Sequence, residues 1–332
     1  MTATDAIVVG LSDMRAAHER IRPHVMRTPV VPMTESRVAL KAESLQPSGS
    51  FKVRGAFNTL LQLSAHERDR GVVAHSSGNH AIAVAHAGAA LGIRVVVVMP
   101  ADAPVVKVAR TRSLGADVVL VGSASSERAA RAAELVVSHG YRLVEPYDSN
   151  SVIAATGTVT IEIVEDLVTE GGSVAELYVP ISGGGLAAGV AAAAKQLDPN
   201  IRVIGVEPAV AADALASRQA GHIVELPAEQ MAGTAADGLR VQKVGTVTWP
   251  YLERYLDEIV TVTEDEISAA VRAVADAARL VAEPSGATPV AAALAGRGGT
   301  GAPAQHRVAV LSGGNVDPTV YLGILDRAAP RP

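Results

Sequence analysis

The chain alternates short apolar runs with longer Ala-rich stretches. The short runs are rich in Val and Ile and continuously apolar, which is typical of parallel strands buried on both faces. The longer stretches have the composition of helices. Strand and helix in repetition indicate an α/β fold built from two open, mostly parallel sheets.

We expect strands at Gly71–His75, Val95–Met99, Val118–Val121, Leu177–Ile181, Val203–Val206 and Val308–Leu311. We expect helices at Gly55–Leu63, Asn79–Leu91, Ala103–Leu114, Ser125–Ser138, Ser151–Glu170, Gly185–Gln196 and Glu264–Val281. These elements form one compact set in 48–145 and a second in 146–330, and the first 45 residues could pack on either. A chain of 332 residues is long enough for two ordinary domains.

Composition and charge narrow the classes of function. Hydrophobic residues make up 48% of the chain, enough for a sizeable core, and the net charge of −5 is spread without long runs. We find no basic patch and therefore expect no nucleic-acid partner. The chain has no cysteine, which excludes disulfides, thiolate catalysis and cysteine-ligated metals.

The apolar runs do not indicate a targeting or membrane segment. The first residues, MTATDAIVVG, lack the basic start and long apolar run of a signal peptide. The apolar run 95–99 is far too short to span a bilayer. We therefore expect a cytoplasmic protein without a membrane partner.

Gly-rich loops follow several expected strands. Ligands of open α/β sheets bind at the carboxyl ends of strands, so these loops are the natural binding positions. The loop SGGGL (182–186) joins an expected strand to an expected helix. Its successive main-chain amides and the helix N-terminus favour a phosphate, with a flexible turn as the alternative.

The same loop admits a second interpretation. Gly183, Gly185 and Ala188 satisfy the pattern G-x-G-x-x-A, and Glu207 ends the next strand. A dinucleotide-binding fold has its ribose-binding acid about twenty residues beyond such a loop. Taken alone, this stretch fits an NAD-dependent oxidoreductase.

Lys52 lies in PSGSFKVRGAFN (47–58), a turn just ahead of a helical stretch. A single lysine is most often a solvated surface residue. Lys52, however, follows Phe51 and precedes Arg54, and partial burial and a nearby cation both lower a lysine pKa. A lowered pKa makes the amine nucleophilic near neutral pH, so Lys52 is a candidate catalytic residue.

Two further strand ends carry polar side chains. The turn HSSGNH (75–80) presents hydroxyls and N–H groups that can hold a carboxylate, although one such residue would serve as an ordinary helix cap. The loop LSGGN carries Ser312. In EPAVAAD, Glu207 and Asp213 could bind Mg²⁺ or Ca²⁺ through oxygen ligands, with acids at a helix N-terminus as the alternative.

Together these motifs resemble the serine/threonine dehydratase and serine racemase family, the fold type II pyridoxal-phosphate enzymes with a tryptophan synthase β-like fold. The resemblance runs nearly end to end and outweighs the nucleotide-binding interpretation. The motifs that carry it are MRAAHERIRPHVMRTPVV (14–31), LKAESLQPSGSFKVRGAFN (40–58), SSGNH (76–80), SVIAATGT (151–158), PISGGGLAAG (180–189), GVEP (205–208), TAADGL (234–239), EPSGA (283–287) and LSGGNVD (311–317).

The resemblance implies pyridoxal 5'-phosphate as cofactor and a role for each matching residue. Lys52 would hold the cofactor as a Schiff base, with Phe51 against its ring, Asn79 at its phenolic oxygen and Ser312 at its pyridine nitrogen. The remaining assignments are a phosphate cradle of Ser182, Gly183, Gly184, Gly185 and Leu186; a substrate-carboxylate site of Ser76, Ser77, Asn79 and His80; Ser77 also as a catalytic residue on the opposite ring face; and a divalent-cation site of Glu207, Asp213 and the carbonyl of Ala211.

The resemblance also implies a homodimer, with a large cofactor-binding domain of 1–47 and 146–332 and a small domain of 48–145. A serine at the pyridine nitrogen makes a weak electron sink, which favours expulsion of a β-leaving group over reprotonation. We therefore expect an ammonia-lyase (dehydratase) that converts L-threonine, L-serine or a related small 3-hydroxy amino acid to a 2-oxo acid and ammonia. Serine racemase or 3-hydroxyaspartate dehydratase on the same scaffold, an NAD-dependent oxidoreductase and a catalytically silent ligand-binding relative are the alternatives.

Several residues depart from the family pattern. Ala155 and Thr156 stand where GQGT is common, Ile82 where Gln is common, and Ser182 where the phosphate loop usually has Gly. These changes leave the substrate open. Ile82 and Tyr147 fall where the racemase branch binds a nucleotide effector, so we expect none here. The short stretch after LSGGNVD also predicts no appended regulatory domain.

Overall fold

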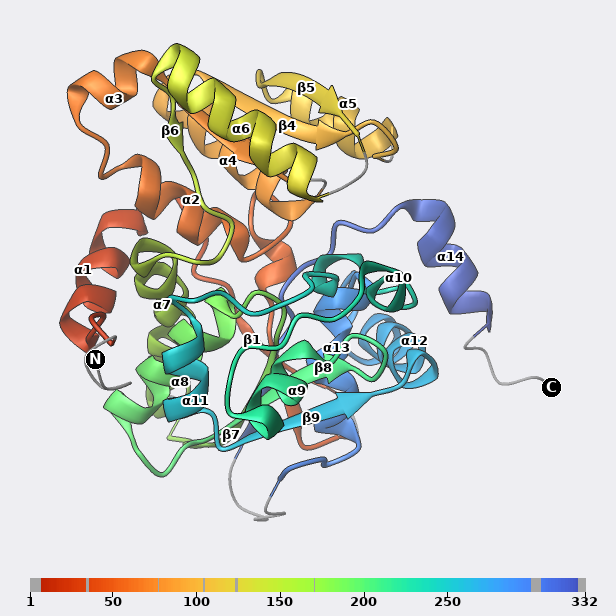
Figure 1. Ribbon diagram of the computed structural model, residues 1–332. Coiled ribbons are helices and arrows are strands. Elements are labelled where there is room, and N and C mark those ends of the chain that lie inside the picture. Colours follow the sequence, from red (N-terminus) through yellow and green to blue (C-terminus); the bar gives the residue numbers. More distant parts are fainter. Residues whose placement is uncertain are drawn as a thin grey trace.

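The computed structural model describes residues 7–33, 36–76, 78–103, 105–122, 125–169, 171–299 and 306–327. Within these ranges the chain forms two sheets with helices on their faces, which confirms the expected α/β class (Figure 1). Among the described helices, none combines the length and apolar character that crossing a membrane requires.

In the described part of the chain, the larger sheet has six strands in the order β1-β2-β10-β7-β8-β9. β1 pairs with β2 antiparallel, and the other neighbours are parallel. The last strand in the chain, β10, therefore lies inside the sheet. The strands are β1 (Val30–Pro32), β2 (Val38–Lys41), β7 (Val174–Pro180), β8 (Arg202–Pro208), β9 (Glu258–Val262) and β10 (His306–Val310).

The smaller sheet, over the same described ranges, has four parallel strands in the order β5-β4-β3-β6. All four lie within 72–143, between the two parts of the chain that build the larger sheet. The predicted domain boundaries at 47/48 and 145/146 stay a prediction. The strands are β3 (Val72–His75), β4 (Val95–Pro100), β5 (Asp117–Val121) and β6 (Arg142–Leu143).

Helices cover the sheets and bury alternate strand residues in different cores. Leu177 and Val179 of β7 pack in one core with α8 (Gly185–Leu197), whereas Tyr178 packs in a second core with α13 (Pro284–Leu294). This alternation is the period of two that a strand imposes. The other helical elements are α1 (Leu11–Ile21), η2 (Glu43–Leu45), α2 (Lys52–Leu60), α3 (Ala65–Arg70), α4 (Asn79–Leu91), α5 (Val105–Ser113), α6 (Ser125–His139), α7 (Asn150–Thr169), α9 (Asp213–Ala220), α10 (Ala228–Met231), η3 (Asp237–Leu239), α11 (Trp249–Tyr255), α12 (Glu264–Ala273), η4 (Val274–Ala278) and α14 (Pro318–Arg327).

The expected strands are confirmed, each within a few residues of its expected ends, but two expected helices are corrected. The helix expected over Glu264–Val281 becomes α-helical α12 followed by the π-helical turn η4, which stops where Arg279 adopts a left-handed φ of 58°. The helix expected over Gly55–Leu63 begins at Lys52 and ends at Leu60. A new helix, capped by Ser64, follows it.

Candidate active site

The turn that carries Lys52 lies against the loop that follows β10. The amide of Phe51 donates to the carbonyl of Ser312 at 3.0 Å, and Ser50 pairs with Gly313 in an isolated antiparallel bridge. Two loops more than 250 residues apart in the chain, 48–52 and 311–315, are thus side by side. The fold brings together the predicted positions Phe51, Lys52 and Ser312.

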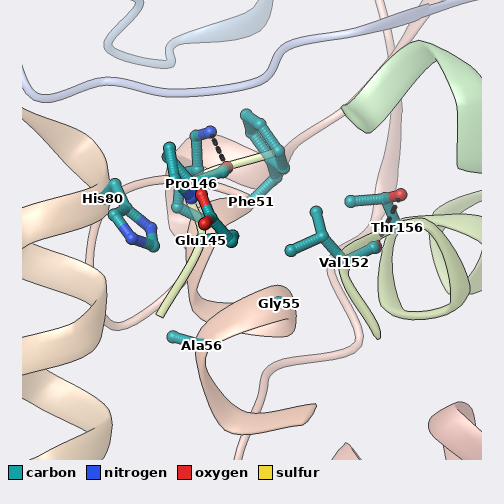
Figure 2. Close-up of a pocket in the computed structure, with 9 residues that line it drawn as sticks. Phe51, Gly55, Ala56, His80, Glu145, Pro146, Val152 and Thr156 are labelled. Carbon is teal, nitrogen blue, oxygen red and sulfur yellow. Dashed lines mark hydrogen bonds between the residues drawn. The ribbon is translucent and has the colours of Figure 1, made fainter. Parts of the chain in front are cut away.

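Lys52 is the first residue of α2 and is half-buried. Its Nζ donates to the carbonyl of Pro146 at 2.6 Å and lies 5.1 Å from the centre of the Phe51 ring. Figure 2 shows this contact at the top of a small pocket that His80, Glu145 and Thr156 also line. Burial lowers the pKa of Lys52 to about 8, so a substantial share of the amine is unprotonated near neutral pH.

Arg54 does not lower that pKa, contrary to the sequence interpretation. Its fully buried guanidinium forms bidentate pairs with Glu43 and Glu162, with N–O distances of 2.7–2.8 Å. Lys41 adds a second cation, 2.7 Å from Glu162. The charge of Arg54 is therefore neutralised away from Lys52, and desolvation alone accounts for the lowered lysine pKa.

The glycine loop joins β7 to α8, as predicted. Gly184 has a φ of 92°, which favours glycine. A Cβ at Gly183 would lie 2.3 Å from the Tyr147 ring, so the loop packs directly on that side chain. Among the described residues, the amides of 183–186 have no recorded acceptor, and the buried hydroxyl of Ser182 has no hydrogen-bond partner. Unpaired donors at a helix N-terminus suit a phosphate.

The turn after β3 has its polar groups partly occupied. Ser77 lies outside the described residues. The hydroxyl of Ser76 accepts the amide of Gly78 at 3.2 Å, and Nε2 of His80 lies 2.9 Å from the carbonyl of Val144. Burial and the charge of Lys52 lower the pKa of His80 to about 3. His80 is therefore neutral, and its Nε2–H is the donor to Val144.

Asn79 leads to a residue that sequence reasoning missed. Its side-chain amide donates to Oε1 of Glu283 at 2.5 Å, and its oxygen accepts from Asn315 at 2.8 Å. Burial, with the charge of Asp237, raises the pKa of Glu283 to about 7. The EPSGA motif contained Glu283, but a glutamate before a proline gives no sign of burial.

Glu207 and Asp213 lie together, apart from Lys52. Glu207 accepts the amides of Ala214 and Leu215 at 2.9 Å, whereas both carboxylate oxygens of Asp213 are buried without a hydrogen-bond partner among the described residues. Burial raises the pKa of both carboxyl groups, and the charge of Asp213 raises that of Glu207 further. Because Glu207 is buried and bonded within its own chain, it is not available to a ribose hydroxyl, which argues against the dinucleotide interpretation.

Comparison with known families decides between the two interpretations of the glycine loop. The family described as "pyridoxal-phosphate dependent enzyme" matches residues 21–313. The chain belongs to this family. The pyridoxal phosphate predicted from the motifs is thereby confirmed as the family's cofactor, and the unpaired amides of 183–186 and the hydroxyl of Ser182 fit its phosphate.

Individual relatives come from both branches of the predicted resemblance. The chain is 38% identical to the L-threonine ammonia-lyase of Thermotoga maritima, over 96% of this chain and 79% of that protein. It is also 38% identical to the serine racemase of Arabidopsis thaliana, over 92% of each.

Solved structures confirm the fold type. Maize serine racemase superposes with a TM-score of 0.89 at 34% identity, covering 97% of this chain and 98% of that one. A threonine deaminase from the organism abbreviated T.th. superposes with a TM-score of 0.86 at 40% identity, covering 93% of this chain and 99% of that one.

Proposed function

We propose that this chain is a pyridoxal-phosphate-dependent ammonia-lyase that converts L-threonine, L-serine or a related 3-hydroxy amino acid to a 2-oxo acid and ammonia. The observation that carries the proposal is the partly buried amine of Lys52, with its lowered pKa, beside the loop of Ser312. The threonine ammonia-lyase and threonine deaminase relatives support this reaction.

Each residue near Lys52 has a task in this proposal. The bound cofactor supplies an electron sink for the bond broken at the substrate α-carbon. Lys52 would attach the cofactor and, once free, remove the α-proton, because an amine with a pKa of about 8 can both lose and regain a proton near neutral pH. Phe51 would pack on the ring, Asn79 would donate to its phenolic oxygen, and Ser312 would face its nitrogen.

The two loops on either side of Lys52 would orient the ligands. The amides of 183–186, with Ser182, would hold the phosphate. Ser76, Ser77, Asn79 and the neutral His80 would hold the substrate carboxylate. Ser77, on the opposite ring face, would exchange the α-proton when the enzyme racemises its substrate. Serine racemase is therefore the second candidate activity, and the Arabidopsis relative favours it.

A panel of 3-hydroxy amino acids tests the reaction. We expect ammonia and a 2-oxo acid from at least one L-enantiomer, and a visible absorbance band that borohydride abolishes. Lys52→Ala should lower kcat by at least about a thousandfold, since it removes both attachment and base. Borohydride labelling at another lysine, or inversion without ammonia release, would contradict the assignment to Lys52 or the ammonia-lyase activity, respectively.

We also propose a divalent-cation site at Glu207, Asp213 and the carbonyl of Ala211. The support is the pair of buried carboxylates, of which Asp213 has both oxygens unpaired among the described residues. Ca²⁺ or Mg²⁺ should raise the melting temperature, and less so in acid, where protons compete for the carboxylates. Asp213→Asn should abolish the shift. An unchanged melting temperature with either metal would refute this site.

The assembly and location expected from the family are part of the same proposal. We propose a cytoplasmic homodimer in which 48–145 forms the small domain and 1–47 with 146–332 the large one. Sedimentation velocity over a range of concentrations should give a single species of twice the 34.0 kDa chain mass. A monomer throughout would contradict the dimer.

A further inference from the structure

The segment 146–148 connects Lys52 with the glycine loop. The carbonyl of Pro146 accepts the Nζ of Lys52 at 2.6 Å. The next residue, Tyr147, packs its ring on Gly183, where a Cβ would lie 2.3 Å from the ring. Asp148 follows, and the proposed function gives it no role.

Asp148 binds the turn that precedes α11. Its carboxylate accepts the amides of Thr246, Val247 and Thr248 at 3.0, 2.8 and 3.1 Å, and the hydroxyl of Thr246 at 3.2 Å. A Cβ at Gly245 would lie 2.0 Å from this carboxylate, so the approach requires glycine there. Hydrogen bonds to a charged acceptor are among the stronger ones, and four of them fix the turn.

That turn in turn holds one peptide of the glycine loop. The hydroxyl of Thr248 donates to the carbonyl of Gly183 at 2.7 Å, and the amide of Gly245 donates to it at 3.1 Å. In a trans peptide the carbonyl of Gly183 and the N–H of Gly184 share one plane and point in opposite directions. Fixing the carbonyl therefore aims the amide of Gly184, whose own φ of 92° is open to few other residues.

We propose that Asp148 is a positioning residue for the cofactor phosphate: through the turn 245–248 it holds the Gly183–Gly184 peptide with its amide toward the phosphate. The inference rests on the phosphate role proposed for the loop 182–186. It predicts that Asp148 affects binding of the phosphate and not of the pyridoxal ring.

Binding of two ligands by the apoprotein separates these effects. Pyridoxal 5'-phosphate and pyridoxal differ only in the phosphate, so the ratio of their dissociation constants reports the phosphate contribution. Asp148→Asn keeps the side-chain size but removes the charge and one acceptor oxygen. We expect roughly tenfold weaker binding of pyridoxal phosphate, equivalent to about 1.4 kcal/mol, with pyridoxal binding unchanged. Equilibrium dialysis measures both constants.

A matched control is Asp198→Asn, since Asp198 also accepts a main-chain amide, that of Asn200 at 2.9 Å, at an exposed turn. Its ligand ratio should equal that of the wild type. Thr248→Val removes only the hydroxyl donor to Gly183 and should lower the ratio in the same direction, whereas Thr248→Ser should restore it. If Asp148→Asn does not fold, the Thr248 pair decides.

Three results would overturn the inference. Equal weakening of both ligands would make Asp148 a general structural residue. Wild-type ratios in Asp148→Asn and Thr248→Val would remove the connection to the phosphate. A wild-type protein that binds both ligands equally would refute the phosphate role of the loop itself, which is a failure of the proposed function and is distinguished by the unmutated protein alone.

Discussion

At Lys52, desolvation changes the acid–base behaviour of the amine without help from a neighbouring charge. Burial penalises the ammonium form, so the proton leaves at a lower pH in the folded chain than in the unfolded one. The contact with the Pro146 carbonyl keeps the amine beside the glycine loop. The residue is thus both placed and activated by the turn in which it lies.

This environment predicts a pH dependence. In the apoprotein, reductive methylation of Lys52 should be half-maximal near pH 8, against the ordinary lysine value of 10.5 in the urea-unfolded chain. Between these pH values the unfolded chain binds more protons, so Lys52 contributes a rise in stability with pH across this window. Mass spectrometry of the peptide containing Lys52 measures its reactivity, and a midpoint near 10.5 in the folded protein would contradict the account.

Single residues could be predicted from the sequence where a motif surrounds them. Lys52 and the glycine loop were recognised in this way. The direction of a side chain could not be: Arg54 follows Lys52 by two residues yet points into a buried ion cluster. Glu283 was missed because its partner, Asn79, lies 204 residues away in the chain.

Among the elements, α2 is held by an ionic cluster consisting of Arg54, Glu43, Glu162 and Lys41. Arg54 belongs to α2, Glu162 to α7, Glu43 to η2 and Lys41 to β2. The cluster therefore fixes the helix that begins with the catalytic lysine against the part of the chain that builds the larger sheet. Its two cations and two anions balance.

Removing the central cation should be costly. Arg54→Leu leaves two carboxylates buried around an apolar side chain, and we expect it to lower the free energy of unfolding by about 3–5 kcal/mol. Arg131→Leu, which breaks the exposed pair with Glu134, should cost less than about 1 kcal/mol. Urea unfolding measures both. Equal effects of the two substitutions would show that the buried cluster does not anchor α2.

Elements were predictable where burial leaves a plain signature. The buried strands β4 and β8 were found because their residues are almost continuously apolar. β6 was missed because it has only two residues, neither of them fully buried. The helix α13 was missed because Pro284, Gly286 and Pro289 are helix-breaking residues, yet Pro284 stands at the helix start, where its missing N–H costs nothing.

At the scale of the molecule, the α/β class followed from alternation, but the order of strands did not. β10 pairs with β2 on one side and β7 on the other, and these three strands are more than 100 residues apart in the chain. No local pattern specifies such pairing, because a strand buried on both faces is equally apolar toward any neighbour.

The interior place of β10 has a consequence for synthesis on the ribosome. The smaller sheet is contiguous in the chain and can form once residue 143 has emerged, whereas β2 and β7 stay unjoined until 306–310 are made. Their exposed edges would meanwhile be open to pairing with other chains. Pulsed hydrogen exchange during refolding should protect the amides of β3 and β4 before those of β2 and β10, and simultaneous protection would contradict this order of folding.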